Sequence, residues 1–229
     1  MKFPLSKLFG KDRPKKPDAV PEGAFSKDSI ARYLPANPIV IEAGAHIGKD
    51  TEEMARLWPD GHIHAFEPFP DVFEKLQKRV KGLKNVTCYS MALADQTGTV
   101  SFNVSSGKSN ASSSLLQPKQ HLEQHPDVFF NERIEVEATR IDDWAVRFNV
   151  PKVDFLWLDL QGYELFALKS GENVLKTVSL IYTEVFLKES YAGAPLYPEV
   201  KLWMESRGFR VEWEGLPWPD SGNVLFVRQ

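Results

Sequence analysis

The chain of 229 residues is long enough to bury a substantial core, and its composition of 42% hydrophobic and 26% charged residues is that of an ordinary globular protein. Its formal net charge of −3 provides no overall attraction to nucleic acid or to an anionic membrane, which argues against a nucleic-acid partner. The single cysteine, Cys88, excludes an intramolecular disulfide and a cysteine-based zinc cluster, and it favours a reducing, cytoplasmic location.

Residues 1–25 form a basic, proline-containing segment that we expect to be a loosely ordered tail ahead of a single domain at 26–229. No stretch of the sequence reaches the 18 apolar residues that a membrane helix needs, and the tail lacks the continuous apolar core of a signal peptide. A few apolar residues beside its lysines, such as Phe3 and Phe9, leave peripheral membrane contact as a weaker alternative.

Apolar runs, caps and turn residues predict alternating helices and strands in the first half. The expected elements are a short helix at 26–34, a buried strand at 38–43, a helix ending near Trp58, a strand at 62–67, a helix at 70–81 and a strand at 85–92. This βαβ spacing predicts a parallel sheet with right-handed crossovers.

The middle of the chain changes character before the alternation resumes. Strands are expected at 99–104 and 133–140, and between them the polar segment 105–130 is long enough to predict a lid or variable loop rather than an inert connection. The remaining expected elements are a strand at 153–160, a helix at 163–176, a strand at 179–186, a helix at 195–207 and an antiparallel strand pair at 209–214 and 223–228.

A turn of small residues follows the first buried strand, in the sequence Ile41-Glu-Ala-Gly-Ala-His-Ile-Gly48. Such a turn lets backbone approach a ligand closely and directs helix N–H groups at it. The second strand ends at Glu67, at the separation of about 20 residues where a Rossmann site holds ribose hydroxyls. Together these features predict a nucleoside-containing cofactor.

The same turn favours one cofactor over another. Dinucleotide enzymes use three glycines, but here only Gly44 and Gly48 are present, and Glu42 would repel a pyrophosphate. A carboxylate at that position would instead attract the ammonium and sulfonium groups of S-adenosylmethionine. An NAD-linked oxidoreductase is therefore the less favoured alternative, and a non-catalytic binding protein on the same fold is another.

Three acids follow later strands. Asp159 and Glu164 lie in Trp157-Leu-Asp-Leu-Gln-Gly-Tyr-Glu164, and Glu184 ends the strand expected at 179–186. Because ligands of open α/β sheets bind beyond the carboxyl ends of the strands, we expect these acids at the site. Asp159 is our first candidate for a general base, with His46, Glu164 and Glu184 behind it. A divalent metal on these oxygens is possible, but hydrogen bonding without a metal is favoured.

Four motifs in order resemble the FkbM family of S-adenosylmethionine-dependent methyltransferases: IEAGAHIGKDT, HAFEPFP, MALADQTGTVSF and LDLQGYE. The resemblance covers about 39–184. It implies a class I, Rossmann-like α/β fold with a mostly parallel seven-stranded sheet and helices on both faces. It also implies methyl transfer to a hydroxyl oxygen of a sugar, glycan, glycolipid or other natural product.

The resemblance also implies roles for individual residues. The methionine part of the cofactor would be surrounded by Glu42, Gly44, Ala45, His46 and Gly48, with Thr51 among the contacts. Glu67 would hold the ribose beside Pro68 and Phe69, Ala92 and Leu93 would lie near adenine, and Asp159 and Gln161 would face the reactive end. The sequence departs from the family where His46 replaces a usual Asn, Gln161 a common Glu and Trp157 a frequent Lys. The last two departures put the usual catalytic electrostatics in doubt.

Overall fold

The computed structural model describes residues 25–229. The tail expected at 1–25, with its alternative of membrane contact, therefore lies outside the described residues apart from Phe25. No helix within 25–229 is long and apolar enough to cross a membrane.

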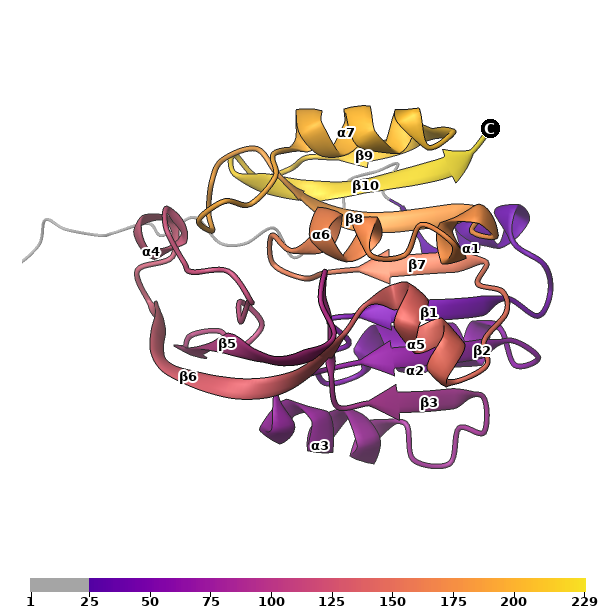
Figure 1. The fold of residues 1–229 in the computed structure, drawn as a ribbon, viewed down its shortest axis with the longest axis horizontal. Coiled ribbons are helices and arrows are strands. Elements are labelled where there is room, and N and C mark those ends of the chain that lie inside the picture. Colours follow the sequence, from indigo (N-terminus) through magenta and orange to yellow (C-terminus); the bar gives the residue numbers. More distant parts are fainter. Residues whose placement is uncertain (1–24) are drawn as a thin grey trace, which may run out of the picture.

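A seven-stranded sheet forms the centre of the molecule, in the order β3-β2-β1-β7-β8-β10-β9 (Figure 1). Its strands are β1 (Ile39–Ala43), β2 (His62–Phe66), β3 (Val86–Tyr89), β7 (Phe155–Leu158), β8 (Leu180–Phe186), β9 (Phe209–Gly215) and β10 (Ser221–Arg228). The pairs among β1, β2, β3, β7 and β8 are parallel, whereas β10 is antiparallel to both β8 and β9. The predicted class I architecture, including the antiparallel final pair, is confirmed.

Helices cover both faces of this sheet because successive strand residues point to opposite sides. On one face, Val40 packs with residues of α1 (Lys27–Ile30) and α2 (Lys49–Leu57). The helix α3 (Pro70–Arg79) packs on the same side, where its Leu76 lies in one cluster with Ala65 of β2. On the other face, Ile41 packs with α5 (Ile141–Arg147), α6 (Glu164–Lys169) and α7 (Tyr197–Ser206). Two short 3-10 turns complete these layers, at Ala31–Tyr33 and Val174–Lys176.

A second, three-stranded sheet lies beyond the carboxyl ends of the parallel strands, where β5 and β6 curve away from the main sheet (Figure 1). It contains β4 (Ala92–Leu93), β5 (Gly98–Gly107) and β6 (Val128–Thr139). The expectation of one strand at 85–92 is wrong, because main-sheet pairing ends at Tyr89 and Ala92 pairs with β6 instead.

The strands β5 and β6 also shorten the predicted loop at 105–130. Their antiparallel pairing continues to Ser106–Phe129 and Gly107–Val128, and the helix α4 (His121–Gln124) lies in the connection. The irregular part is therefore confined to 108–127, apart from α4. The polar residues at 105–107 concealed the end of β5, and the short apolar run at 128–130 directly follows a polar loop, so neither end was predicted although the two pair with each other.

The helix expected at 163–176 is interrupted after Lys169. The Ser170 hydroxyl donates to the Ala167 carbonyl at 2.6 Å and accepts from the Ile141 N–H at 3.0 Å, so this side chain ties the helix end to the start of α5. A Cβ on Gly171 would lie 2.8 Å from the Ile141 side chain, which leaves room only for glycine there.

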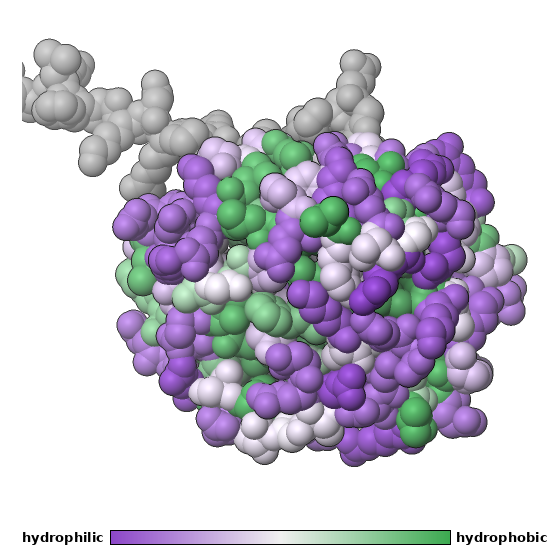
Figure 2. All heavy atoms as spheres, turned by 45° about the horizontal axis from the view of Figure 1, so that its top comes forward, coloured by the Kyte–Doolittle hydropathy of each residue, from purple (hydrophilic) through white to green (hydrophobic). Residues whose placement is uncertain are grey.

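Figure 2 shows the face on which α7 is turned toward the viewer. Polar residues cover most of it, and apolar residues emerge only in small groups between them. Leu202 of α7 is 70% exposed. The concave feature that the sequence predicts lies instead at the carboxyl ends of the parallel strands.

Candidate active site

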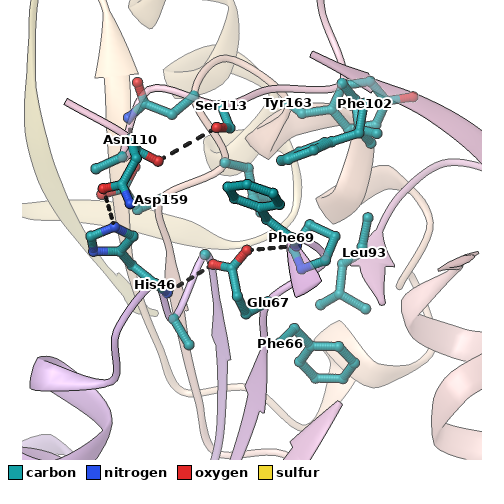
Figure 3. Close-up of a pocket in the computed structure, with 18 of the residues that line it drawn as sticks. His46, Phe66, Glu67, Phe69, Leu93, Phe102, Asn110, Ser113, Asp159 and Tyr163 are labelled. Carbon is teal, nitrogen blue, oxygen red and sulfur yellow. Dashed lines mark hydrogen bonds between the residues drawn. The ribbon is translucent and has the colours of Figure 1, made fainter. Parts of the chain in front are cut away.

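A cavity of about 240 Å³ opens where β1, β2 and β7 end, between the main sheet and the second sheet (Figure 3). Most residues that the sequence assigned to the cofactor line it, namely Gly44, Ala45, His46, Glu67, Pro68, Phe69, Ala92, Leu93, Asp159 and Gln161. Glu42, Gly48 and Thr51 do not line it, and Glu42 and Thr51 are buried behind the β1–α2 turn. Their contact with the cofactor stays a prediction.

Backbone hydrogen bonds hold the start of the β1–α2 turn against β2. The N–H groups of Gly44 and Ala45 both donate to the Phe66 carbonyl oxygen, at 3.1 and 2.9 Å. Gly44 has φ +82°, and a Cβ there would lie 1.9 Å from the Asp159 carbonyl oxygen. Only glycine allows the ends of β1 and β7 to approach so closely. The turn thus brings the predicted cofactor residues of β1 beside the acid that follows β7.

Glu67 is 6% exposed and points from the end of β2 toward the same turn (Figure 3). Its carboxylate accepts from the His46 N–H at 2.9 Å and from the Phe69 N–H at 2.8 Å. Burial raises the pKa of Glu67 to about 7 in spite of these two bonds, and the charge of Asp159 adds to the rise. Glu67 is therefore a fixed acceptor at the cavity wall.

Several lining residues were missed by sequence reasoning. Apolar side chains of Phe66, Met91, Phe102 and Leu115 form walls, and polar ones are added by Asn110 and Ser113 of the segment 108–127 and by Tyr163, which directly precedes α6. Tyr163 follows a motif glycine directly, and its hydroxyl donates to Asp95 at 2.8 Å. The serine-leucine run at 112–115 was the signal that could have indicated Ser113 and Leu115. Phe102 is the last residue of the motif MALADQTGTVSF, but the motif alone did not indicate that β5 would place it in the cavity wall.

The three predicted acids meet at the rim of the cavity. Asp159, Glu164 and Glu184 each present a carboxylate oxygen, and these oxygens lie within 4.8 Å of one another. Glu164 is 4% exposed and accepts from the Leu160 N–H at 2.7 Å. Only Asp159 of the three lines the cavity itself. The sheet topology explains the meeting, because β7 and β8 are parallel neighbours whose carboxyl ends share one edge.

Crowding of these acids changes their proton affinity. Burial raises the pKa of Glu164 to about 8, and burial together with the charges of Asp159 and Glu164 raises the pKa of Glu184 well above its ordinary value. The pKa of Asp159 is also raised, because protein atoms around the rim displace water, although hydrogen bonds from neighbours oppose this. A carboxylate with a pKa near 8, as at Glu164, can take up and release a proton near neutral pH.

Oxygen donors in this arrangement suit a hard cation in principle. However, the Gln161 Nε2 donates to Asp159 Oδ1 at 2.7 Å and to Glu184 Oε2 at 2.6 Å. An amide donor thus occupies the position between the two carboxylates that a cation would use. Hydrogen bonding without a metal stays a prediction at this site.

The segment 108–127 contacts the cofactor turn directly. The His46 Nε2 lies 2.9 Å from Asn110 Oδ1 (Figure 3). Ser114 donates to the Gln161 carbonyl oxygen at 2.8 Å. The segment therefore forms one side of the cavity, as a lid would.

Comparison with known proteins agrees with this geometry. The model of the methyltransferase FkbM domain matches residues 42–211. The chain is 30% identical over 162 residues to the 2-O-methyltransferase NoeI of Sinorhizobium fredii, covering 69% of this chain and 67% of that protein. It is 24% identical over 219 residues to the methyltransferase sdnD of Sordaria araneosa, covering 86% and 83%.

A solved structure shows the same fold. Fibrillarin of Aeropyrum pernix, crystallised with natively bound S-adenosyl-L-methionine, aligns with a TM-score of 0.51 at 14% identity, covering 85% of this chain and 69% of that one. The sequence motifs, the cavity at the strand ends and the family match decide against the NAD-linked and non-catalytic alternatives. The chain belongs to the FkbM family and is an S-adenosylmethionine-dependent methyltransferase.

Proposed function

We propose that the enzyme transfers a methyl group to a hydroxyl oxygen of a small-molecule or glycan acceptor. The observation that carries the proposal is the acid cluster at the cavity rim, because an alcohol must lose its proton as it is methylated. The naming of the relative NoeI as a 2-O-methyltransferase supports the same chemistry.

Polar lining residues of the cavity would suit the polar parts of the cofactor, and apolar lining residues would suit its adenine. Glu67 would accept hydrogen bonds from the ribose hydroxyls, since each carboxylate oxygen bonded to a backbone N–H keeps a free lone pair. Leu93 and Phe69 would pack on the adenine, and the bare backbone at Gly44 would admit the methionine part. Asp159 and Gln161 would then lie toward the reactive end.

Bound S-adenosylmethionine supplies an activated methyl group, and the residues of the chain must align an acceptor with it. Alignment alone contributes up to about 7–11 kcal/mol to lowering the barrier. Asp159, which faces the cavity, would accept the proton of the acceptor hydroxyl as the new O–CH₃ bond forms and the S–CH₃ bond breaks. A positioned base of this kind contributes roughly 10²–10⁴-fold.

The charge around the rim also favours a particular kind of acceptor. The cavity is lined by the acids Asp50, Glu67 and Asp159 and by one cation, Lys49. A phosphorylated or carboxylated reacting group would be repelled by these acids. We therefore infer an uncharged hydroxyl at the reacting end of the acceptor.

The proposal is tested in two stages. Calorimetry should show binding of S-adenosylhomocysteine and none of NADH. Purified enzyme with S-adenosylmethionine carrying a labelled methyl group should then be incubated with sugar, glycolipid and lipid-linked glycan extracts. Mass spectrometry should find the label as an ether of an acceptor hydroxyl. Label found on nitrogen or carbon would overturn the proposal.

A further inference from the structure

The side-chain amide of Gln161 makes contacts on both of its ends. Its Nε2 lies 2.7 Å from Asp159 Oδ1 and 2.6 Å from Glu184 Oε2, and its Oε1 lies 2.9 Å from the Tyr191 hydroxyl. The side-chain oxygen accepts from the Tyr191 hydroxyl, so the NH₂ group faces the two carboxylates and each of its two hydrogens serves one acid. The amide is therefore a bridge with a defined orientation.

Buried groups fix that bridge in place. Tyr191 is fully buried, and its hydroxyl also lies 2.8 Å from the Ser112 carbonyl oxygen. The Gln161 backbone has φ +51°, which is uncommon for a residue with a side chain. Its carbonyl oxygen accepts from the Ser114 hydroxyl at 2.8 Å. A strained backbone with this many specific partners indicates a position set for function.

Within the described residues, no positively charged side chain pairs with the acids that the Gln161 amide contacts. Within residues 25–229, none of Asp159, Glu164 and Glu184 forms an ion pair. Two carboxylates this close repel each other when both are ionised, so they share a proton unless donors stabilise their charge. A glutamate at position 161 would add a fourth carboxylate to the cluster, whereas glutamine adds two donors.

We propose that Gln161 is a positioning residue, whose amide holds the carboxylates of Asp159 and Glu184 side by side and is itself oriented by Tyr191. The catalytic meaning of the pair rests on the proposed function, in which Asp159 accepts the proton of the acceptor. By donating to both acids, Gln161 favours their ionised forms and keeps the base available at neutral pH.

Carboxyl ¹³C NMR titration of the full-length protein tests this without an acceptor. The resonances of the pair are identified by their loss in Asp159→Asn and Glu184→Gln. Gln161→Met keeps the length of the side chain and removes both donors, so the first titration midpoint of the pair should rise by about one pH unit or more. Gln77→Met, at an exposed position on α3, is the matched control and should leave both midpoints unchanged.

Tyr191→Phe should raise the same midpoint by a smaller amount, and it should add nothing in the Gln161→Met background. If Gln161→Met fails to fold, Tyr191→Phe decides alone: a raised midpoint supports the proposal and an unchanged one overturns it. Unchanged midpoints in folded Gln161→Met would overturn it directly. A shifted titration in an enzyme that methylates no hydroxyl would overturn the proposed function and leave the pairing intact.

Discussion

Glu67 serves the fold and the proposed cofactor site with one carboxylate. Because charge-assisted hydrogen bonds contribute about 1.5–3 kcal/mol each, Glu67→Ala should weaken binding of S-adenosylhomocysteine at least about tenfold. The two backbone N–H groups that Glu67 accepts from are also released, so circular dichroism should be recorded to show that the fold survives. Calorimetry that gives an unchanged Kd would remove Glu67 from the site.

Asp159 is the residue on which the proposed chemistry depends. Asp159→Asn keeps the shape of the side chain and removes the charge, so turnover should fall roughly 10²-fold or more with a smaller change in cofactor affinity. Glu184→Gln is the matched comparison, since it tests the other acid that Gln161 contacts. Near-normal turnover of Asp159→Asn beside an inactive Glu184→Gln would assign the base to Glu184. Activity that requires Mg²⁺ and is abolished by EDTA would make both acids metal ligands.

The sequence predicted individual cavity residues where the residue type itself points to a chemical role. Glu67 and Asp159 follow apolar strands, so the sequence placed both at the predicted site, and both line the cavity. Gln161 was placed at the site, but its bridge between two acids depends on Glu184, 23 residues further along the chain. This contact arises because β7 and β8 are neighbours in the sheet. The spacing of motifs along the sequence does not predict which strands are neighbours.

At the level of elements, strands with continuous apolar runs were predicted well, and marginal elements were not. The helix α5 was missed although Ile141, Trp144 and Ala145 have helical spacing and are buried, because the segment is short and follows a long strand. The ends of β5 and β6 were missed because each is stabilised only by the other. Pairing of this kind is a tertiary effect that overrides local composition.

The segment 108–127 remains a predicted lid, and its lysines allow a test. Trypsin should cut after Lys108 and Lys119, both of which have exposed side chains, and cofactor with acceptor should slow these cuts. Lys81 and Lys84 are exposed between α3 and β3 and provide a control whose cutting should not change. Equal rates at 108 and 119 with and without ligands would contradict a lid.

The stability of the whole molecule should depend on pH through its buried acids. Glu42 is 2% exposed, and burial raises its pKa to about 8 from an ordinary value of 4.5, while neighbouring Thr51 offsets only part of the rise. Between these two pH values the folded state holds a proton that the unfolded state has lost. The free energy of unfolding should therefore fall as the pH rises from about 5 to 8. Glu67 and Glu164 act in the same direction.

Glu42→Gln mimics the protonated acid and should remove its share of this pH dependence. We expect a Tm equal to that of the natural protein at pH 5 and higher at pH 8, by roughly 2–4 °C for each kcal/mol recovered in a domain of this size. Thermal unfolding of both proteins at the two pH values is the measurement. A variant that is less stable at pH 8 would show that Glu42 is ionised and paired in the folded state.

The position of β10 between β8 and β9 also sets the order in which the enzyme can be assembled during synthesis. A nascent chain that has reached α7 has completed β8, but the residues that will pair with the free side of β8 have not yet been made. That side is a row of unpaired backbone groups, a template for pairing with other chains. The unfinished enzyme is therefore most exposed to aggregation just before its last strand emerges, when a chaperone would be of most use.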